Sequence, residues 1–311
     1  MKKSASVLSV LAVASISLFS CLEESEYEKQ VKQDDLKISA YLKDNNIAAK
    51  RSSTGIYYEE LIENTSGTTP KLGDVVFIKY DMRKLNGNLV ESNTETLTKF
   101  KFAWTSIMPN GFNYGVDLLK KGEKNRFYLP SYMAFDSYSF GEVFGSYENF
   151  IVEMELVNFK TEDEMYEIEI DSIDNYIAQN QIEDVESYTS GLYFKNLDAG
   201  DGDSPSGYSE VEFYFTRKYL DGTVIEKTEP LSPLKVTLNE GRLVEGLRQG
   251  ILKMKEGGKA LLIMPSDIAF GASIQVIPTS LREDFLDDNI ITTRVIPYTP
   301  VLYEVELVSV N

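Results

Sequence analysis

Residues 238–271 read LNEGRLVEGLRQGILKMKEGGKALLIMPSDIAFG, and this stretch decides the fold. It contains a helix-sized segment, Leu243–Leu252, followed by a glycine turn and the apolar run Leu261–Pro265. Two strand-like runs and a hairpin turn precede it: Val211–Thr216, Asp221-Gly222 and Leu234–Leu238. Asp-Gly between apolar runs is typical of a β-hairpin, so the stretch predicts antiparallel strands around one short helix.

The landmarks of this stretch also occur earlier in the chain, at one constant offset. Gly246 lies 135 residues after Gly111 (246 − 111 = 135), and five further pairs repeat this offset. These pairs are Gly115/Gly250, Gly122/Gly257, Lys124/Lys259, Pro130/Pro265 and Ala134-Phe135/Ala269-Phe270. Such a series predicts an internal duplication, and 311 residues suit two domains of ordinary size.

Each predicted unit begins with a helix and ends with a strand. The leading helices, Asp34–Asn46 and Asp171–Gln181, share the pattern Ile-x-x-Tyr-[Leu/Ile]-x-x-Asn-x-Ile. The charged run Glu162–Glu169 is interpreted as the link between the units. The predicted fold class is α+β, with an antiparallel sheet wrapped on one short helix in each unit. The predicted domains are residues 34–160 and 161–311.

The second unit carries an insertion before its last strand. The closing strands, Phe150–Val157 and Leu302–Val308, are separated by 151 residues (307 − 156 = 151) rather than 135, which leaves 16 additional residues (151 − 135 = 16). They fall within Ala272–Arg294, which is a loop of the length that functional loops often have.

Composition excludes several classes of function. The formal net charge of −18 argues against a nucleic-acid partner, since binding a polyanion relies on clustered Lys and Arg. The chain has no histidine, which removes imidazole catalysis and His-ligated metal sites, and neither a metal nor a cofactor is expected. Its single cysteine cannot form an internal disulfide.

The first 21 residues have the pattern of an export signal. A charged start, Met1-Lys2-Lys3, precedes an apolar run that is too short to span a bilayer. The end of the run, Leu18-Phe19-Ser20-Cys21, resembles the lipobox of bacterial lipoproteins, which implies lipidation of Cys21. An ordinary signal peptide with an incidental cysteine is the alternative. Residues 22–33 are acidic, are expected to be a tether, and resemble the surface-export signal of some Bacteroidetes lipoproteins.

Residues 238–259 and 263–271 together resemble FKBP-type peptidyl-prolyl isomerases. The family pattern is an Asp-Gly turn, a Val-Ile-x-Gly-Trp helix start, Met-x-x-Gly-x-Lys, Pro-x-x-x-Ala-Tyr-Gly and a final Val-Glu-Leu strand. The second unit matches this pattern nearly end to end, and the first unit matches it more faintly. The chain is similar to the tandem or single-domain FKBP-like lipoproteins of Bacteroidetes. The resemblance implies isomerisation of X-Pro bonds in polypeptide clients. This reaction breaks no covalent bond and needs no general base.

The resemblance also implies a pocket in the second unit. Its residues would be Phe215, Ile225, Glu226, Leu243, Val244, Leu247, Phe270 and Tyr303. Leu247 stands where the family usually has Trp, and Phe215 and Phe270 stand where it has Tyr, so two hydroxyl groups are missing. Glu226 replaces Asp, and Val244 keeps the position whose backbone N–H bonds the ligand.

The equivalent pocket of the first unit is more divergent. Its residues would be Tyr80, Val90, Glu91, Met108, Phe112, Phe135 and Val152. Pro109 occupies the backbone-donor position and has no N–H, and Asp136 replaces the glycine after Ala134-Phe135. The only tryptophan, Trp104, falls outside the expected floor position. We therefore expect this unit to be inactive.

Three functions are compatible with these patterns. The first is a prolyl isomerase for exported proteins that is active in the second unit. It would be lipid-anchored in a Gram-negative envelope, at the outer membrane, on the periplasmic face or the cell surface. The second is a non-catalytic protein that binds a peptide or partner through the degenerate pocket or the inserted loop. The third is a structural surface lipoprotein. Ile296–Pro300 resembles the family's proline-bearing flap, although two prolines ahead of a strand are also common in ordinary loops.

Overall fold

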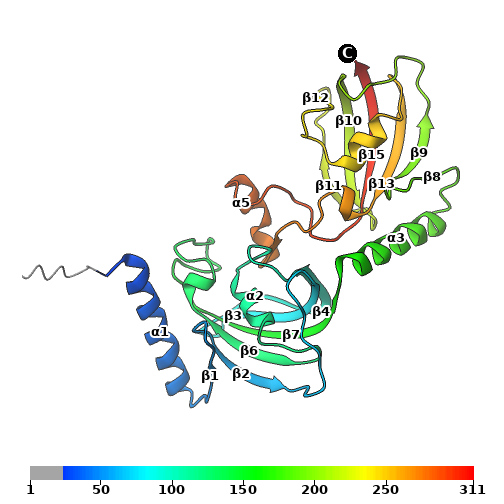
Figure 1. The fold of residues 1–311 in the computed structure, drawn as a ribbon. Coiled ribbons are helices and arrows are strands. Elements are labelled where there is room, and N and C mark those ends of the chain that lie inside the picture. Colours follow the sequence, from blue (N-terminus) through cyan, green and yellow to red (C-terminus); the bar gives the residue numbers. More distant parts are fainter. Residues whose placement is uncertain (1–23) are drawn as a thin grey trace, which may run out of the picture.

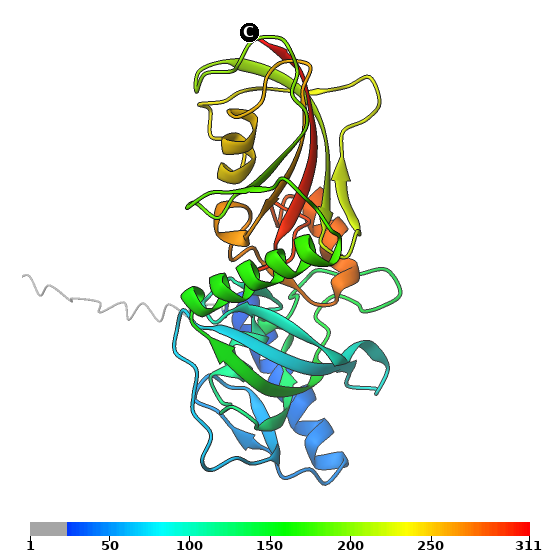
Figure 2. The same cartoon turned by 90° about the vertical axis from the view of Figure 1, so that its right-hand side faces the viewer.

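The computed structural model describes residues 24–311, so the predicted signal peptide and Cys21 lie outside the described residues. Two domains follow one another along the chain, and the long helix α3 (Glu162–Gln179) runs along their junction (Figures 1 and 2). Each domain has its own antiparallel sheet and apolar core, which confirms the predicted α+β duplication. In the stretch from residue 24 onward, no helix has both the length and the apolarity needed to cross a membrane.

The first domain is a six-stranded sheet with the order β1-β2-β6-β7-β3-β4. Helix α2 packs against one face of the sheet, and its aromatic side chains join the core of the domain. The elements are α1 (Glu26–Asp44), β1 (Lys50–Arg51), β2 (Tyr57–Ile62), β3 (Val75–Lys84), β4 (Leu89–Lys101), β5 (Ile107–Met108), α2 (Gly111–Val116), β6 (Lys124–Leu129), η1 (Ser131–Met133) and β7 (Phe150–Lys160).

The second domain repeats this plan, with the strand order β11-β10-β15-β13-β9-β8 and β12 paired with β10. Its elements after α3 are β8 (Glu186–Ser187), β9 (Tyr193–Asp198), β10 (Glu210–Tyr219), β11 (Val224–Lys227), β12 (Leu234–Thr237), α4 (Glu245–Ile251), β13 (Lys259–Met264), η2 (Ser266–Ile268), β14 (Gln275–Val276), η3 (Thr279–Leu281), α5 (Arg282–Asp287) and β15 (Val301–Val310).

The paired glycines of the sequence let each short helix lie directly on its sheet. A Cβ added at Gly250 in α4 would come within 2.3 Å of Leu262 Cδ1 on β13. At the equivalent Gly115 in α2, it would come within 2.4 Å of Met154 Cε on β7. Both separations are far below van der Waals contact, so a larger residue at either position would force its neighbour on the sheet to move.

The leading helices begin earlier than the sequence predicts. Helix α1 starts at Glu26, because Ser25 and Glu28 form a capping box, so most of residues 22–33 is helical rather than an extended tether. Helix α3 starts at Glu162 in the same way, with Thr161 and Glu164 as its capping box. The charged run 162–169 is therefore the first half of a helix and not a link.

Each leading helix is fixed to its domain by one buried carboxylate. Asp34 Oδ2 accepts hydrogen bonds from Ser131 N at 2.9 Å and from Ser131 Oγ at 2.6 Å. Glu169 accepts from Ser266 N at 2.6 Å and from Ser266 Oγ at 2.8 Å. The two pairs are related by the repeat offset (169 − 34 = 135; 266 − 131 = 135), so the duplicated unit includes its leading helix.

The insertion of the second domain packs mainly against the first domain. It contains β14, η3 and α5, and β14 pairs in parallel with β5. Helix α5 lies at the junction of the two domains (Figures 1 and 2). Apolar side chains of the insertion belong to the core cluster of the first domain, so the two domains share packing surface.

Candidate functional site

The predicted pocket residues of the second domain lie together in the structure. Leu247 and Tyr303 are buried at the base. Five apolar residues around them are partly buried and pack against the same core: Phe215, Ile225, Leu243, Val244 and Phe270. They come from β10, β11, α4 and the residues just before it, the turn after η2, and β15, so the fold gathers residues that are far apart in the sequence.

Arg217 lies within this cluster of pocket residues, although no sequence motif points to it. Its guanidinium carbon lies 4.5 Å from the centre of the Phe270 ring. Its Nη1 donates to Tyr303 Oη at 3.0 Å, and its Nη2 pairs with the Glu226 carboxylate. Arg217 is only 8% exposed, and its Nε has no hydrogen-bond partner in the described part of the chain. A buried polar group without a partner is costly, and this nitrogen is an enclosed donor that lacks an acceptor.

The position of Arg217 follows from the period of its strand. In β10, Val211 and Phe213 point into the core, and every second residue faces the same side of a strand. Arg217 continues this series inward, and it lies opposite Tyr303 on β15 and Glu226 on β11. In the sequence, the signal for this inward position is a charged residue at one of the alternating positions of the strand that are otherwise apolar. Burial raises the pKa of the Tyr303 hydroxyl, against the influence of Arg217, so Tyr303 remains a neutral acceptor.

The start of α4 offers a backbone donor. Val244 is the N-cap of α4 and has an extended backbone. Among residues 24–311, its N–H donates no hydrogen bond, and the side chain is only partly buried. The first N–H groups of a helix have no partner within the helix, so they are available to a ligand carbonyl. This cluster of pocket residues thus retains a backbone donor, whereas Phe270 has no hydroxyl group.

The predicted residues of the first-domain pocket also lie together. Tyr80, Phe112, Phe135 and Val152 are buried, and Val90 and Met108 pack against them. Glu91 accepts a hydrogen bond from the Tyr80 hydroxyl, whose pKa is raised by burial and then by Glu91. Phe112 occupies the floor, with its ring edge-on to Tyr80 at 5.4 Å. Trp104 is 59% exposed and lies outside the pocket, beside Tyr114.

The segment Ile296–Pro300, which resembles a flap in the sequence, turns toward the domain junction. Tyr298 is buried, and its hydroxyl donates to Glu162 in α3 at 2.8 Å. Its ring packs against Val75 and Met165. This anchoring holds the flap-like segment against the first domain and α3.

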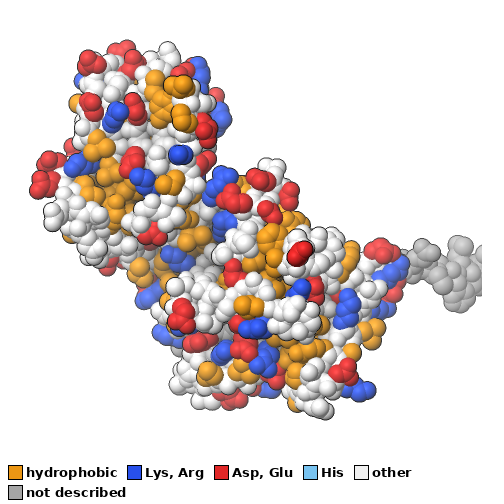
Figure 3. Space-filling model, turned by 180° about the vertical axis from the view of Figure 1, so that it is seen from behind, with side chains coloured by type: hydrophobic (Ala, Val, Ile, Leu, Met, Phe, Trp, Pro, Cys, Tyr) orange, Lys and Arg blue, Asp and Glu red, His pale blue; other side chains and the backbone are white. Residues whose placement is uncertain are grey.

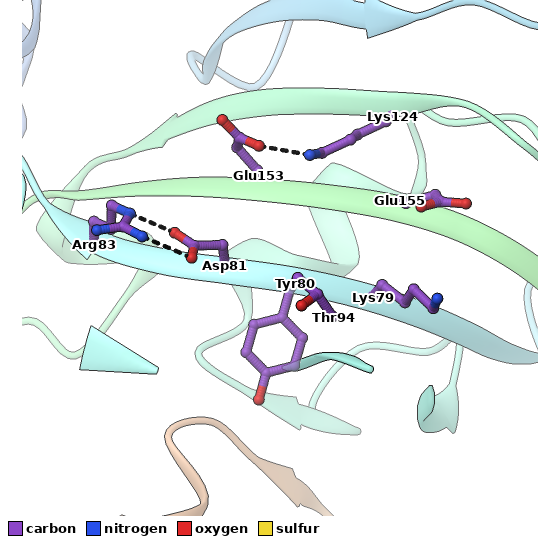
Figure 4. A pocket seen from close by; sticks show the side chains of 8 residues that line it. All are labelled: Lys79, Tyr80, Asp81, Arg83, Thr94, Lys124, Glu153 and Glu155. Carbon is purple, nitrogen blue, oxygen red and sulfur yellow. Dashed lines mark hydrogen bonds and ion pairs between the residues drawn. The ribbon is translucent and has the colours of Figure 1, made fainter. Parts of the chain in front are cut away.

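A further hollow of about 340 Å³ lies on the outer face of the first sheet (Figure 4). Four of its charged side chains are paired, because Arg83 pairs with Asp81 and Lys124 pairs with Glu153. Tyr80 points to the other side of the sheet.

Acidic and basic side chains are interspersed over the view in Figure 3. Over residues 24–311, no three potential ligand side chains cluster in a way that would hold a metal ion.

Comparison with known proteins covers both domains. The family model for FKBP-type peptidyl-prolyl cis-trans isomerases matches residues 66–180 and 202–308. A probable FKBP-type isomerase, FkpA of Neisseria meningitidis, is 26% identical over 134 residues, which are 42% of this chain and 48% of that protein. Outer membrane protein MIP of Legionella longbeachae is 30% identical over 82 residues, which are 26% of this chain and 35% of that protein.

The three FKBP domains of wheat FKBP73 align at 25% identity with a TM-score of 0.33, over 83% of this chain and 96% of that chain. The chain spans about half the length of the first curated relatives that it matches, 48% and 54%. The two matched regions of the family model cover 115 and 107 residues (180 − 66 + 1; 308 − 202 + 1), which is more than half of the 311. The chain therefore belongs to the FKBP-type peptidyl-prolyl cis-trans isomerase family and contains two domains of that type.

Proposed function

We propose that the second domain catalyses cis-trans isomerisation of X-Pro bonds in exported polypeptides. One observation carries this choice. In the second domain Phe215, Val244 and Phe270 are only partly buried, and the Val244 N–H has no hydrogen-bond partner among residues 24–311. The equivalent Tyr80, Pro109 and Phe135 of the first domain are buried. A client carbonyl can bond to Val244 while the proline ring contacts Phe215 and Phe270.

Arg217 is the group that distinguishes this site from the family pattern. The isomerisation barrier is the lost resonance of the X-Pro bond, and the prolyl nitrogen becomes a better hydrogen-bond acceptor as the bond twists. A donor placed at the base of the cleft stabilises the twisted state more than the planar one. In this proposal, the Arg217 guanidinium, which lies over the Phe270 ring, donates to the prolyl nitrogen.

A second candidate is non-catalytic binding of peptides or partner proteins. The observation that favours it is the same guanidinium, which is 8% exposed and takes up space that a proline ring requires. The absence of hydroxyl groups at Phe215 and Phe270 also favours it. In this case Arg217 blocks the base of the cleft, and clients bind only at the rim.

A protease-free isomerisation assay separates the two candidates. Residues 22–311 are compared with Arg217→Met, which keeps volume and removes the donors, and with Arg217→Gly, which empties the base. Arg242→Met serves as the matched control, because its side chain is 61% exposed. For the donor role, we expect Arg217→Met to lower kcat/KM on the order of 10²-fold, as for loss of one transition-state donor. A silent parent chain with an active Arg217→Gly refutes the catalytic proposal and supports the second candidate.

We also propose that the protein acts in the cell envelope, anchored through Cys21 to a membrane. The lipobox-like Leu18-Phe19-Ser20-Cys21 and the similarity to an outer membrane protein support this location. Growth of the expressing bacterium with an alkyne-tagged palmitate tests it. The parent chain should carry the label and Cys21→Ser should not; an unlabelled parent chain contradicts lipidation.

A further inference from the structure

The inserted segment of the second domain lies in the pocket of the first domain. Strand β14 adds to β5, with the backbone N–H of Gln275 donating to Ser106 O at 2.9 Å. The N–H of Ile277 donates to Met108 O at 2.8 Å. Met108 is one of the residues of the first-domain pocket, so the insertion forms backbone hydrogen bonds at the edge of that pocket.

A second set of bonds holds the other end of the same short segment. The backbone N–H and the hydroxyl of Thr279 both donate to Glu91 Oε2, at 2.8 and 2.7 Å. Glu91 is also a pocket residue, so Ile277-Pro278-Thr279 extends between Met108 and Glu91. Ile277 and Pro278 are both buried. The segment therefore crosses the pocket instead of passing over its surface.

Apolar contacts continue along the insertion. Leu281 and Phe285 are buried, and both belong to the core cluster of the first domain. The ring of Phe285 lies 6.4 Å from that of Phe135 and 5.3 Å from that of Tyr138. Phe135 is a third pocket residue. Backbone addition at a strand edge, buried apolar anchors and one charged acceptor are the elements by which domains bind extended peptides.

We infer that the pocket of the first domain is a peptide-binding site and that residues 274–291 are its resident ligand. The chemistry selects an extended segment with apolar residues before a proline and a hydroxyl residue after it, as in Val276-Ile277-Pro278-Thr279. The site is closed to other polypeptides because its occupant is part of the same chain. This inference goes beyond the proposed function, which concerns the second domain.

The covalent connection explains why the site stays closed. A ligand on the same chain acts at an effective concentration on the order of millimolar, so a free peptide at micromolar concentration is outcompeted. Weakening the resident segment should therefore uncover a site that the parent chain hides. The change must act on the insertion and leave the pocket unaltered.

The test uses a fluorescein-labelled peptide with the sequence of residues 273–281, SIQVIPTSL, and fluorescence anisotropy. Residues 22–311 are compared with Ile277→Asp, which puts a charge into the buried apolar cluster. The matched control is Ile290→Asp, since Ile290 lies in the same insertion and is 39% exposed. We expect saturable binding by Ile277→Asp and roughly 10²-fold weaker binding by the parent chain and by Ile290→Asp. A folded Ile277→Asp that does not bind the peptide overturns the inference and makes the insertion a clamp only.

A milder variant covers the case in which Ile277→Asp does not fold. Thr279 is exposed, so Thr279→Ala removes one bond to Glu91 and leaves the core intact. Hydrogen exchange at residues 275–281 should rise roughly tenfold, as for loss of one bond to a charged group. A millimolar excess of the unlabelled peptide should raise it further, because the peptide competes for the site. Exchange that does not respond to the peptide overturns the inference.

Discussion

Replacing Phe285 by alanine should destabilise the first domain, although Phe285 belongs to the second. Its side chain is 1% exposed and packs against Phe135 and Tyr138. Truncation of a buried Phe costs about 3–5 kcal/mol, and we expect about 3 kcal/mol, because α5 is a short helix at the junction that can relax into the gap. For a domain of this size, that loss lowers Tm by roughly 10 °C.

The single tryptophan makes this prediction measurable. Trp104 lies in the first domain beside Tyr114, so tryptophan fluorescence during thermal unfolding follows that domain alone. Leu231→Ala is the control, since Leu231 is 94% exposed in the second domain and should leave the Trp104 transition in place. If Phe285→Ala lowers Tm by far-UV circular dichroism and leaves the Trp104 transition unchanged, the insertion does not stabilise the first domain and the reasoning fails.

Three further predictions concern the second domain. Ser266→Ala should lower the free energy of unfolding by about 1–3 kcal/mol, because buried Glu169 loses a donor; the exposed Ser204→Ala should have no effect in the same urea titration. Burial raises the pKa of Glu169 against the hydrogen bonds from Ser266, so protonation of Glu169 favours the folded state. The free energy of unfolding of the parent chain, relative to that of Glu169→Gln, should therefore rise as the pH falls from 7 toward 4.5. A difference that does not change with pH contradicts this. Gly250→Ala should cost about 1–3 kcal/mol through its contact with Leu262, whereas Gly145→Ala, which faces open space, should cost little; equal losses in thermal unfolding would contradict the close packing of α4.

The sequence predicts the local plan of both domains because that plan depends on short-range rules. The glycine pairs place α2 and α4 correctly, and the repeat offset places the pocket residues from the family pattern. The alternation that starts at Val211 places Arg217 on the inward face of β10, but a pattern aligned by apolar landmarks gives a charged residue no role there. The destination of the insertion depends on how two domains are oriented, and the spacing of Ile277 and Phe285 along the chain carries no information about that orientation.

The two pockets differ at several positions, and one inward difference bears on how the insertion occupies the first pocket. Met82 is the repeat equivalent of Arg217 (217 − 135 = 82), is fully buried and lies opposite both Glu91 and Val152. Methionine leaves an apolar recess that Ile277 can enter, whereas a guanidinium there would pair with Glu91, as Arg217 pairs with Glu226. Met82→Arg should therefore displace Thr279 from Glu91 and raise hydrogen exchange at residues 275–285, while Met82→Leu keeps the recess apolar and should leave exchange low. Equal protection in the two variants would mean that the insertion is held by contacts outside the pocket.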